Sequence, residues 1–301
     1  MIRLALRLRR EDAELVLAEL LALAPAGVEE VDLGDGMLEY AVYGAPGELP
    51  ELPDLHAAAG GALVEITTQE LPDDWSERWK SFHRPVLIES PAAGVPALYI
   101  RPPWESPCAG LNVSDIAIDP AQAFGTGAHA TTRLCLQLLL ELAANSRGPL
   151  LDVGTGSGVL AIAAARLGFA PVLGLDNDPE SVRAAEINAQ VNDVPVEVRR
   201  FDLRAQPLPA AGEGVLVANL LRPLLLELAG TLTAAPTDLL ASGLLVDELD
   251  EIAQAFAPLG LREHDRRHDG EWAALWLRRS QAAEPTSAAA PTSVAARAIA
   301  R

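Results

Sequence analysis

The sequence LDVGTGSGVL at residues 151–160 decides the fold, because a short apolar stretch runs through three glycines into an apolar helical pattern. A strand, a glycine loop and a helix in this order bring backbone close to a ligand at the start of the helix. Loops that bind dinucleotides have the spacing G-x-G-x-x-G. Here the third glycine, Gly158, comes one residue early, and Val159 stands where a dinucleotide loop has glycine. The spacing therefore favours a different ligand.

Two carboxylates accompany the loop. Asp152 precedes the first glycine, where it would repel a pyrophosphate but could balance the ammonium group of a methionine moiety. Asp176 ends the next apolar stretch, and a carboxylate there can accept hydrogen bonds from both ribose hydroxyls. A structural explanation remains open, since Asp176 and Asp178 could cap a helix that begins near Pro179. Together the features favour S-adenosyl-L-methionine over a nicotinamide cofactor.

Short apolar stretches alternate with helical patterns from about residue 131 onward. This alternation predicts a doubly wound parallel sheet with helices on both faces. Two last strand candidates follow each other without room for a helix, so we expect an antiparallel hairpin at the edge of the sheet. The seven expected strands cover residues 150–153, 172–176, 196–199, 215–219, 239–242, 261–267 and 272–278.

The first part of the chain has a different pattern. Strands are expected at residues 2–8, 28–33, 37–43 and 62–68, with helices at 11–23 and 53–59. Asp35 and Gly36 form a hairpin signal between the second and third strands. The resulting βαββαβ order resembles a ferredoxin-like α+β unit.

A short helix is expected to connect the two parts. Trp75, Trp79 and Phe82 would share one face of it, either for packing between domains or for contact with a substrate. Proline-rich stretches at 91–96 and 102–107 should be loops between short strands. We therefore expect a recognition domain at 1–70, a connecting helix and linker at 71–90, a catalytic domain at 91–280 and a disordered tail at 281–301.

Composition limits the class of protein. The net charge is −19, which repels nucleic acid and favours cationic partners, although it could serve solubility alone. No apolar run is long enough for a membrane span or a secretory signal, so we expect a cytoplasmic protein. Cys108 and Cys135 form no CxxC pair, and neither a disulfide framework nor a metal site is indicated.

A longer motif supports a family resemblance. Residues 119–133 read DPAQAFGTGAHATTR, and residues 217–220 read VANL. With the glycine loop, they closely resemble the bacterial methyltransferases that modify large-subunit ribosomal protein eleven, whose pattern is D-P-G-x-A-F-G-T-G-x-H-x-T-T, D-x-G-x-G-S-G and V-A-N-[IL]. The resemblance covers most of residues 73–279. Ala130 departs from the family's habit, because proline or glutamate is more usual at that position.

The resemblance implies a fold, a cofactor site and a substrate. The fold is a seven-stranded Rossmann-like class I methyltransferase domain after a small ferredoxin-like domain. The substrate amines are lysine side chains and the terminal α-amino group of that ribosomal protein, free or on the ribosome, with no direct binding of nucleic acid or membrane. The implied S-adenosylmethionine site comprises Thr132, Gly154, Asp176 and Asn219, a closing loop with Phe124, Gly125, Thr126 and Gly127, and Asp152, Gly156 and Gly158 of the glycine loop.

Two residues are candidates for the chemistry, and no catalytic residue is assigned. Asn219 is followed by Leu220-Leu221-Arg222 instead of the Pro-Pro-[Tyr/Phe] of enzymes that methylate planar amide or adenine nitrogens, which favours an aliphatic amine. Asn219 could also cap a helix at 220–228. His129 should fix its loop by a hydrogen bond, with a role as base the alternative. Rival functions are a lysine methyltransferase for another basic protein, or an inactive protein that binds the same cofactor.

Overall fold

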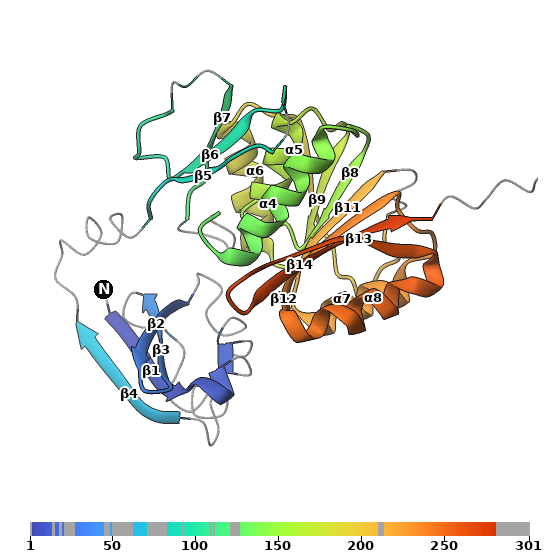
Figure 1. Cartoon of the computed structure of the whole chain (residues 1–301). Helices are drawn as coiled ribbons and strands as arrows, with labels where there is room; N and C mark the ends of the chain where they lie inside the picture. Colours follow the sequence, from blue (N-terminus) through green and yellow to red (C-terminus); the bar gives the residue numbers. More distant parts are fainter. Residues whose placement is uncertain are drawn as a thin grey trace, which may run out of the picture.

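The computed structural model describes residues 2–13, 16–17, 20, 28–44, 49, 63–70, 83–91, 93–108, 110, 112–120, 127–209 and 214–280. Three sheets organise these residues, and the largest lies at the centre of the carboxyl-terminal part (Figure 1). None of the helices in the described ranges is long and apolar enough to cross a membrane.

The large sheet has the strand order β10-β9-β8-β11-β12-β14-β13. Five neighbouring strands, β10, β9, β8, β11 and β12, are parallel. Helices α5, α6 and α7 follow β8, β9 and β11 and carry the chain back to the end of the sheet where the next parallel strand begins. β14 pairs antiparallel with β12 and with β13, so the chain ends this sheet in a hairpin. The strands are β8 (Leu150–Val153), β9 (Val172–Asp176), β10 (Val196–Arg200), β11 (Val215–Asn219), β12 (Asp238–Leu245), β13 (Leu261–Asp269) and β14 (Trp272–Arg279).

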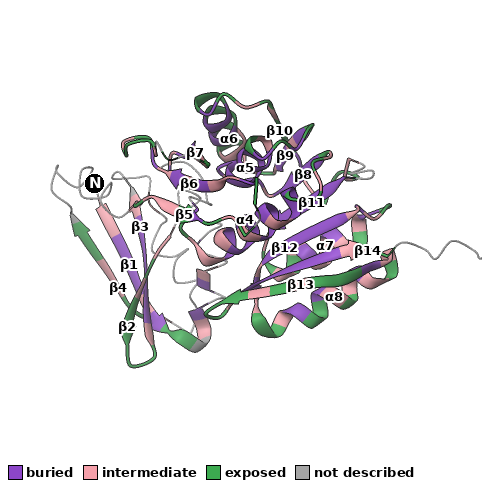
Figure 2. Cartoon of the chain, turned by 45° about the horizontal axis from the view of Figure 1, so that its top comes forward, coloured by how far each residue is buried: buried purple, intermediate pink, exposed green. Residues whose placement is uncertain are grey.

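Helices cover both faces of this sheet. Side chains alternate along each strand, so Leu150 and Val217 lie in one buried cluster while Leu151 and Leu216 lie in the other. The central strands are accordingly buried, whereas much of β13 is exposed (Figure 2). The helices are α4 (Ala130–Ala143), α5 (Val159–Arg166) and α6 (Pro179–Val191) on the first face and α7 (Arg222–Thr231) and α8 (Leu249–Phe256) on the second, with 3-10 turns η3 (Val246–Glu248) and η4 (Ala257–Leu259).

The amino-terminal sheet has the order β2-β3-β1-β4, with all neighbours antiparallel. Asp35 and Gly36 join β2 to β3 with positive φ angles of 51° and 74°, as the predicted hairpin requires. One face is apolar and packs against Val16 and Leu20. The elements are β1 (Ile2–Arg9), η1 (Arg10–Asp12), β2 (Glu29–Gly34), β3 (Met37–Gly44) and β4 (Leu63–Glu70).

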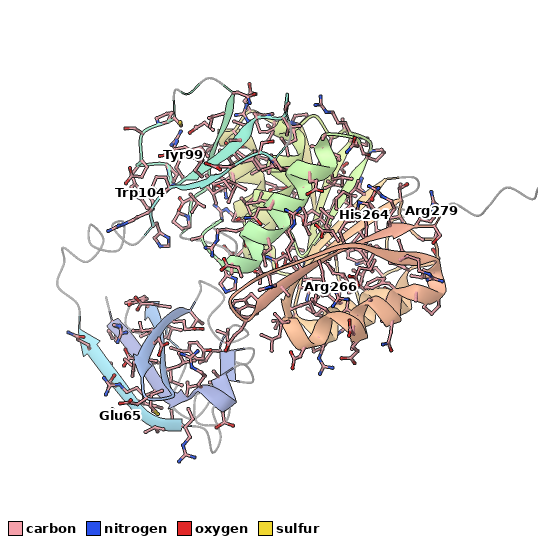
Figure 3. All side chains as sticks on the ribbon, viewed as in Figure 1. Glu65, Tyr99, Trp104, His264, Arg266 and Arg279 are labelled. Carbon is pink, nitrogen blue, oxygen red and sulfur yellow. The ribbon has the colours of Figure 1, made fainter. Side chains whose placement is uncertain are left out.

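The other face of this sheet is charged. Arg7 of β1 forms ion pairs with Glu39 of β3 (2.7 Å) and with Glu65 of β4 (2.8 Å), and Glu65 is marked in Figure 3. The predicted helix at 11–23 is described only in part. The predicted helices at 53–59 and around Trp75–Phe82, and the tail after 280, lie outside the described residues.

A three-stranded sheet precedes the central one in the chain. It consists of β5 (Val86–Ile88), β6 (Ala97–Arg101) and β7 (Val113–Ala117), and the two proline-rich stretches lie in the loops between them. β5 falls within the expected linker, so the linker ends before residue 86. The buried side chains of Leu98, Ile100 and Ile116 join the cluster around α4 and α5.

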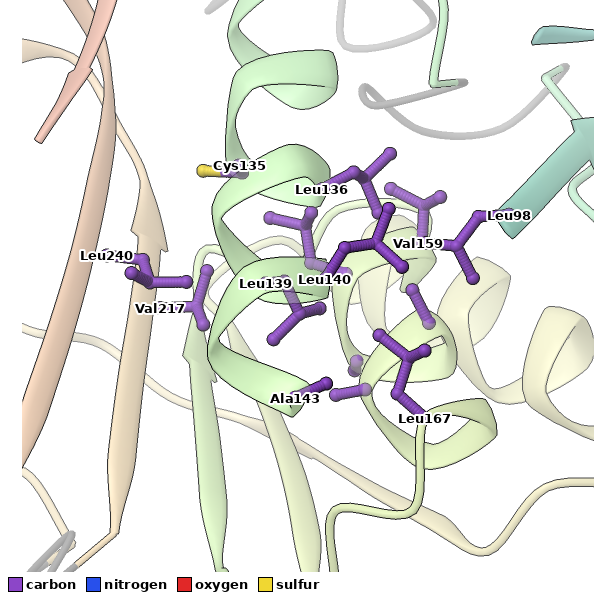
Figure 4. Packing of buried hydrophobic residues seen from close by; sticks show 14 of the residues in the cluster. Leu98, Cys135, Leu136, Leu139, Leu140, Ala143, Val159, Leu167, Val217 and Leu240 are labelled. Carbon is purple, nitrogen blue, oxygen red and sulfur yellow. The ribbon is translucent and has the colours of Figure 1, made fainter. Parts of the chain in front are cut away.

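Helix α4 holds the two sheets together. Leu136, Leu139 and Leu140 pack among side chains of β6, α5, β11 and β12 (Figure 4). Cys135 of the same helix is fully buried in this cluster, so it is a packing residue. This packing fixes the beginning of α4 over the carboxyl ends of the parallel strands.

Candidate functional site

The candidate site lies at the carboxyl ends of β8 and β11. In the sheet, β8 lies between β9 and β11. The chain passes from β8 to β9 on one side, and from β11 to β12 on the other side. The connections therefore leave β8 and β11 in opposite directions, and ligands bind α/β sheets at such points. The loops after β8, β9 and β11 and the beginning of α4 all reach this place.

The loop after β8 requires glycine at two positions at least. Gly154 has φ +75°, and a Cβ there would come within 2.3 Å of Leu220 Cδ2. Gly158 has φ +82°, and its Cβ would lie 3.0 Å from the Cβ and 3.1 Å from the Cα of Ala185 in α6. The close approach of Leu220, which follows β11, and of α6 to the loop therefore explains why glycine stands at positions 154 and 158.

Asp176 lies at the carboxyl end of β9, beside the glycine loop. Its Oδ2 accepts a hydrogen bond from the Gly156 N–H (2.8 Å), and its Oδ1 accepts one from the Asp178 N–H (3.0 Å). Burial raises the pKa of the carboxyl group, and these two N–H groups partly offset the rise. Asp178 caps α6 by accepting from the backbone of Glu180 and Ser181, so the cap that the sequence left open belongs to Asp178.

Asp152 lies underneath the loop and is fully buried. Its Oδ2 accepts a hydrogen bond from the Thr155 hydroxyl (2.7 Å), and its Oδ1 has no hydrogen-bond partner among the described residues. Burial raises the pKa of Asp152 to about 7, against the lowering effect of the Thr155 hydroxyl. A charge contact between Asp152 and a bound ammonium group stays a prediction.

Asn219 and Thr132 meet across the site. Asn219 ends β11, and its Nδ2 donates to Oγ1 of Thr132 (3.3 Å), which is fully buried in the first turn of α4. The predicted helix at 220–228 begins later, at Arg222 with Leu221 as N-cap residue. The expectation that Asn219 caps this helix is therefore wrong. The Leu220 N–H donates to the Ser242 carbonyl of β12 (2.9 Å), so the strand pairing continues past Asn219 before the helix begins.

His129 is the N-cap residue of α4. Its Nδ1 lies 2.8 Å from the Thr131 hydroxyl and accepts from the Thr131 N–H (3.4 Å). The ring packs edge-on against Trp272 of β14, with 4.9 Å between ring centroids. Burial lowers its pKa, and the charge of Arg133 lowers it further. These contacts support the loop-fixing role that the sequence favoured.

The closing loop is described only at its end. Phe124, Gly125 and Thr126 lie outside the described residues, so their predicted contacts stay predictions. Gly127 has φ +86°, and a Cβ there would lie 3.0 Å from Ile100 of β6. No group of three metal-ligating side chains occurs among the described residues.

The sequence did not indicate the contacts that two residues make in the site. Leu220 covers Gly154, and Trp272 supports His129 from the tip of the β13–β14 hairpin. Trp272 stands at the beginning of a strand candidate, where an aromatic residue is ordinary. No local signal reveals that it reaches the start of α4.

Comparisons with known proteins agree with this geometry. The family model described as "Ribosomal protein L11 methyltransferase (PrmA)" matches residues 53–280. The ribosomal protein L11 methyltransferase of Heliobacterium modesticaldum is 39% identical over 213 residues, which are 69% of this chain and 65% of the relative. The alignment thus spans just under two thirds of that relative's length. The enzyme of the same name from Geobacter sulfurreducens is 39% identical over 234 residues, with 75% of this chain and 74% of the relative covered.

One solved structure is similar in both fold and sequence. The crystal structure of ribosomal protein L11 methylase from Lactobacillus delbrueckii subsp. bulgaricus superimposes with a TM-score of 0.55 at 34% identity. The superposition covers 61% of this chain and 95% of the other.

Proposed function

Because the chain belongs to the ribosomal protein L11 methyltransferase family, we propose that it methylates amines of ribosomal protein L11 with S-adenosylmethionine. The substrate groups are lysine side chains and the terminal α-amino group. One observation carries the proposal: the glycine loop, Asp176 and the Asn219–Thr132 pair meet at the carboxyl ends of β8, β9 and β11.

The residues at this place fit S-adenosylmethionine. The loop at Gly154–Gly158 exposes backbone where side chains would clash, which suits close contact with an extended ligand. Asp176 has the geometry to accept ribose hydroxyls, since a carboxylate has about four acceptor positions and two N–H donors use part of them. Thr132 and Asn219, together with the predicted loop residues Phe124, Gly125 and Thr126, would surround the methionine end.

The chemistry needs alignment and a neutral amine more than a protein nucleophile. Bound S-adenosylmethionine supplies an activated methyl group with its leaving group attached. The chain's own task is to hold the amine in line with that methyl group. A lysine with a pKa near 10.4 is neutral in only about one molecule in 2,500 at pH 7, so the site must favour loss of the ammonium proton.

We assign the orientation of the amine to Asn219. Its position at the end of β11, beside the buried Thr132 hydroxyl, gives a fixed polar group at the mouth of the site. Leu220 and Leu221 follow it instead of two prolines, which suits an aliphatic chain better than a planar nitrogen. His129 contributes by capping α4, with its Nδ1 engaged by Thr131.

The two parts of the chain divide the work in this proposal. Residues 91–280 form a class I methyltransferase domain, an assignment supported by the order of its seven strands. Residues 1–70 form a ferredoxin-like recognition domain, an assignment supported by the order β2-β3-β1-β4. The segment between residue 70 and β5 connects them, and residues 281–301 are a tail. We place the enzyme in the cytoplasm, acting on free or ribosome-bound L11, with a net charge of −19 that disfavours direct contact with nucleic acid.

Labelled S-adenosylmethionine provides the decisive experiment. The protein is incubated with purified large ribosomal subunits or free ribosomal proteins, and the labelled band is identified by mass. We expect label on L11 alone, on amine nitrogens. Label on another basic protein, or binding of the cofactor without transfer, would overturn the proposal.

A further inference from the structure

Two buried asparagines lie at the carboxyl end of helix α6, Asn188 in its last turn and Asn192 as its C-cap residue, and they are 2% and 3% exposed. A buried amide side chain is tolerated only where hydrogen bonds replace its lost contact with water. Both side chains meet this requirement with backbone groups from other segments. The segments that they reach differ, and this difference carries the inference.

Asn188 connects the glycine loop to the beginning of the 119–133 motif. Its Nδ2 donates to the carbonyl oxygen of Ser157 (2.9 Å), and its Oδ1 accepts from the Asp119 N–H (3.1 Å). The partners fix the orientation of the amide, because the opposite orientation would place oxygen against oxygen and N–H against N–H. One side chain thus spans two segments that are distant in sequence and that both lead into the site.

Asn192 makes a similar set of bonds without reaching the loop. Its Nδ2 donates to the carbonyl oxygens of Ala117 (2.7 Å) and Asn188 (2.8 Å), and its Oδ1 accepts from the Ala117 N–H (2.9 Å). It therefore fastens α6 to the end of β7. The two asparagines are one helical turn apart and equally buried, so each is a control for the other.

We propose that Asn188 is a positioning residue for cofactor binding, which fixes the glycine loop against the segment that begins at Asp119. This proposal rests on the proposed function in one respect, namely that S-adenosylmethionine binds at the glycine loop. Ser157 lies between Gly156, whose N–H binds Asp176, and Gly158, which packs on Ala185. Loss of Asn188 removes a hydrogen bond from the carbonyl oxygen of the fully buried Ser157, so the loop is held less firmly in this position.

The test compares Asn188→Ala with Asn192→Ala by calorimetric titration with S-adenosylhomocysteine and by hydrogen exchange of the ligand-free protein. We expect Asn188→Ala to weaken binding about tenfold and to speed amide exchange at residues 154–158 several-fold. Asn192→Ala removes three hydrogen bonds instead of two, so it should lower the melting temperature at least as much. Its affinity should nevertheless stay within about threefold of the parent protein, because its bonds do not reach the loop.

A second variant separates the two arms of the amide. Asn188→Asp keeps an acceptor for the Asp119 N–H, but its carboxylate cannot donate to Ser157, so it should show the same weakening. Asn188→Ser replaces Asn188→Ala if the alanine variant does not fold. Equal loss of affinity in Asn188→Ala and Asn192→Ala, or unchanged affinity in Asn188→Asp, would overturn the proposal. If the parent protein itself fails to bind S-adenosylhomocysteine, the proposed function falls, and the exchange rates at 154–158 still decide the role of Asn188.

Discussion

At the scale of single residues, Asp176 has the most direct consequence. We expect Asp176→Ala to weaken S-adenosylmethionine binding by about 1.5–3 kcal/mol, because two ribose hydroxyls lose a charged acceptor. That range is roughly a tenfold to hundredfold change in the dissociation constant. The affinity of Asp176→Asn should lie between those of the parent protein and Asp176→Ala, since asparagine keeps one oxygen acceptor. Titration calorimetry on folded variants measures the effect, and unchanged affinity in Asp176→Ala would refute the assignment.

Asp152 should make stability depend on pH. Burial raises its pKa from the ordinary value of 3.8 to about 7. At a pH between these two values, the carboxyl group is protonated in the folded protein and ionised in the unfolded chain. Stability from this group therefore falls as pH rises from about 4 to 7, and stays at the lower level above pH 7. Asp152→Asn removes the titration. We expect the variant's melting temperature, relative to the parent protein, to be higher at pH 8 than at pH 5; the reverse order would contradict the raised pKa.

His129 offers a test of the substrate nitrogen. The rate of methylation should rise from about pH 7 to 9, since the neutral fraction of a lysine grows roughly tenfold per unit below its pKa. His129→Asn preserves a side chain that caps helices well, so it should keep this slope with a modest loss of rate. The measurement is a pH profile at saturating cofactor with chemistry rate-limiting. A flat profile in the parent protein would argue against an amine, and a changed slope in His129→Asn would restore the role as base.

At the scale of elements, the glycine loop and α6 form one packed unit. We expect Gly158→Ala to destabilise the protein by about 2 kcal/mol or more, because alanine is strained at φ +82° and its Cβ would meet the backbone of Ala185. Gly148→Ala is the matched control, since nothing lies within 4 Å of a Cβ there and its backbone is not left-handed. That control should change stability by less than about 0.5 kcal/mol. Urea denaturation of both variants measures the free energy of unfolding. A loss in Gly158→Ala as small as that in Gly148→Ala would show that the loop tolerates a side chain.

The parallel strands could be located from the sequence because each is a short, buried apolar run with a polar or glycine residue after it. The positions of Gly154, Asp176 and Asn219 at strand ends followed from the same pattern, and the structure brings them to one edge. Short strands beside the proline-rich loops were expected, but the bounds of β5 were not predicted, since three residues carry too little period to separate a strand from a linker.

Contacts between distant segments could not be read in this way. The late start of α7 follows pairing of Leu220 with Ser242 of β12, and the importance of Trp272 depends on its ring reaching His129. Asn188 was hidden for the same reason. An asparagine among alanines in a helix is a weak local signal, and its partners are Ser157 and Asp119, far from it in sequence.

At the scale of the whole molecule, the two parts should separate in function. Among the described residues, the amino-terminal sheet contains no glycine loop with an acidic strand end, so a chain beginning at residue 71 should bind S-adenosylmethionine with little loss. It should methylate L11 far more slowly, because substrate is no longer held near the methyl group. Binding is measured by calorimetry and transfer with labelled cofactor. An intact rate on full-length L11 would leave residues 1–70 with a stabilising role only.

The two edges of the central sheet have a consequence for behaviour at high concentration. Unpaired strand edges are the places where folded proteins add strands to one another and aggregate. β10 exposes Glu197, Arg199 and Arg200 at one edge. β13 at the other edge is bulged between Glu263 and Asp265, and its ion pairs include Arg266 (marked in Figure 3) with Asp250 of α8. An incoming strand would have to desolvate these charges at either edge, so the charges oppose edge-to-edge association of two sheets.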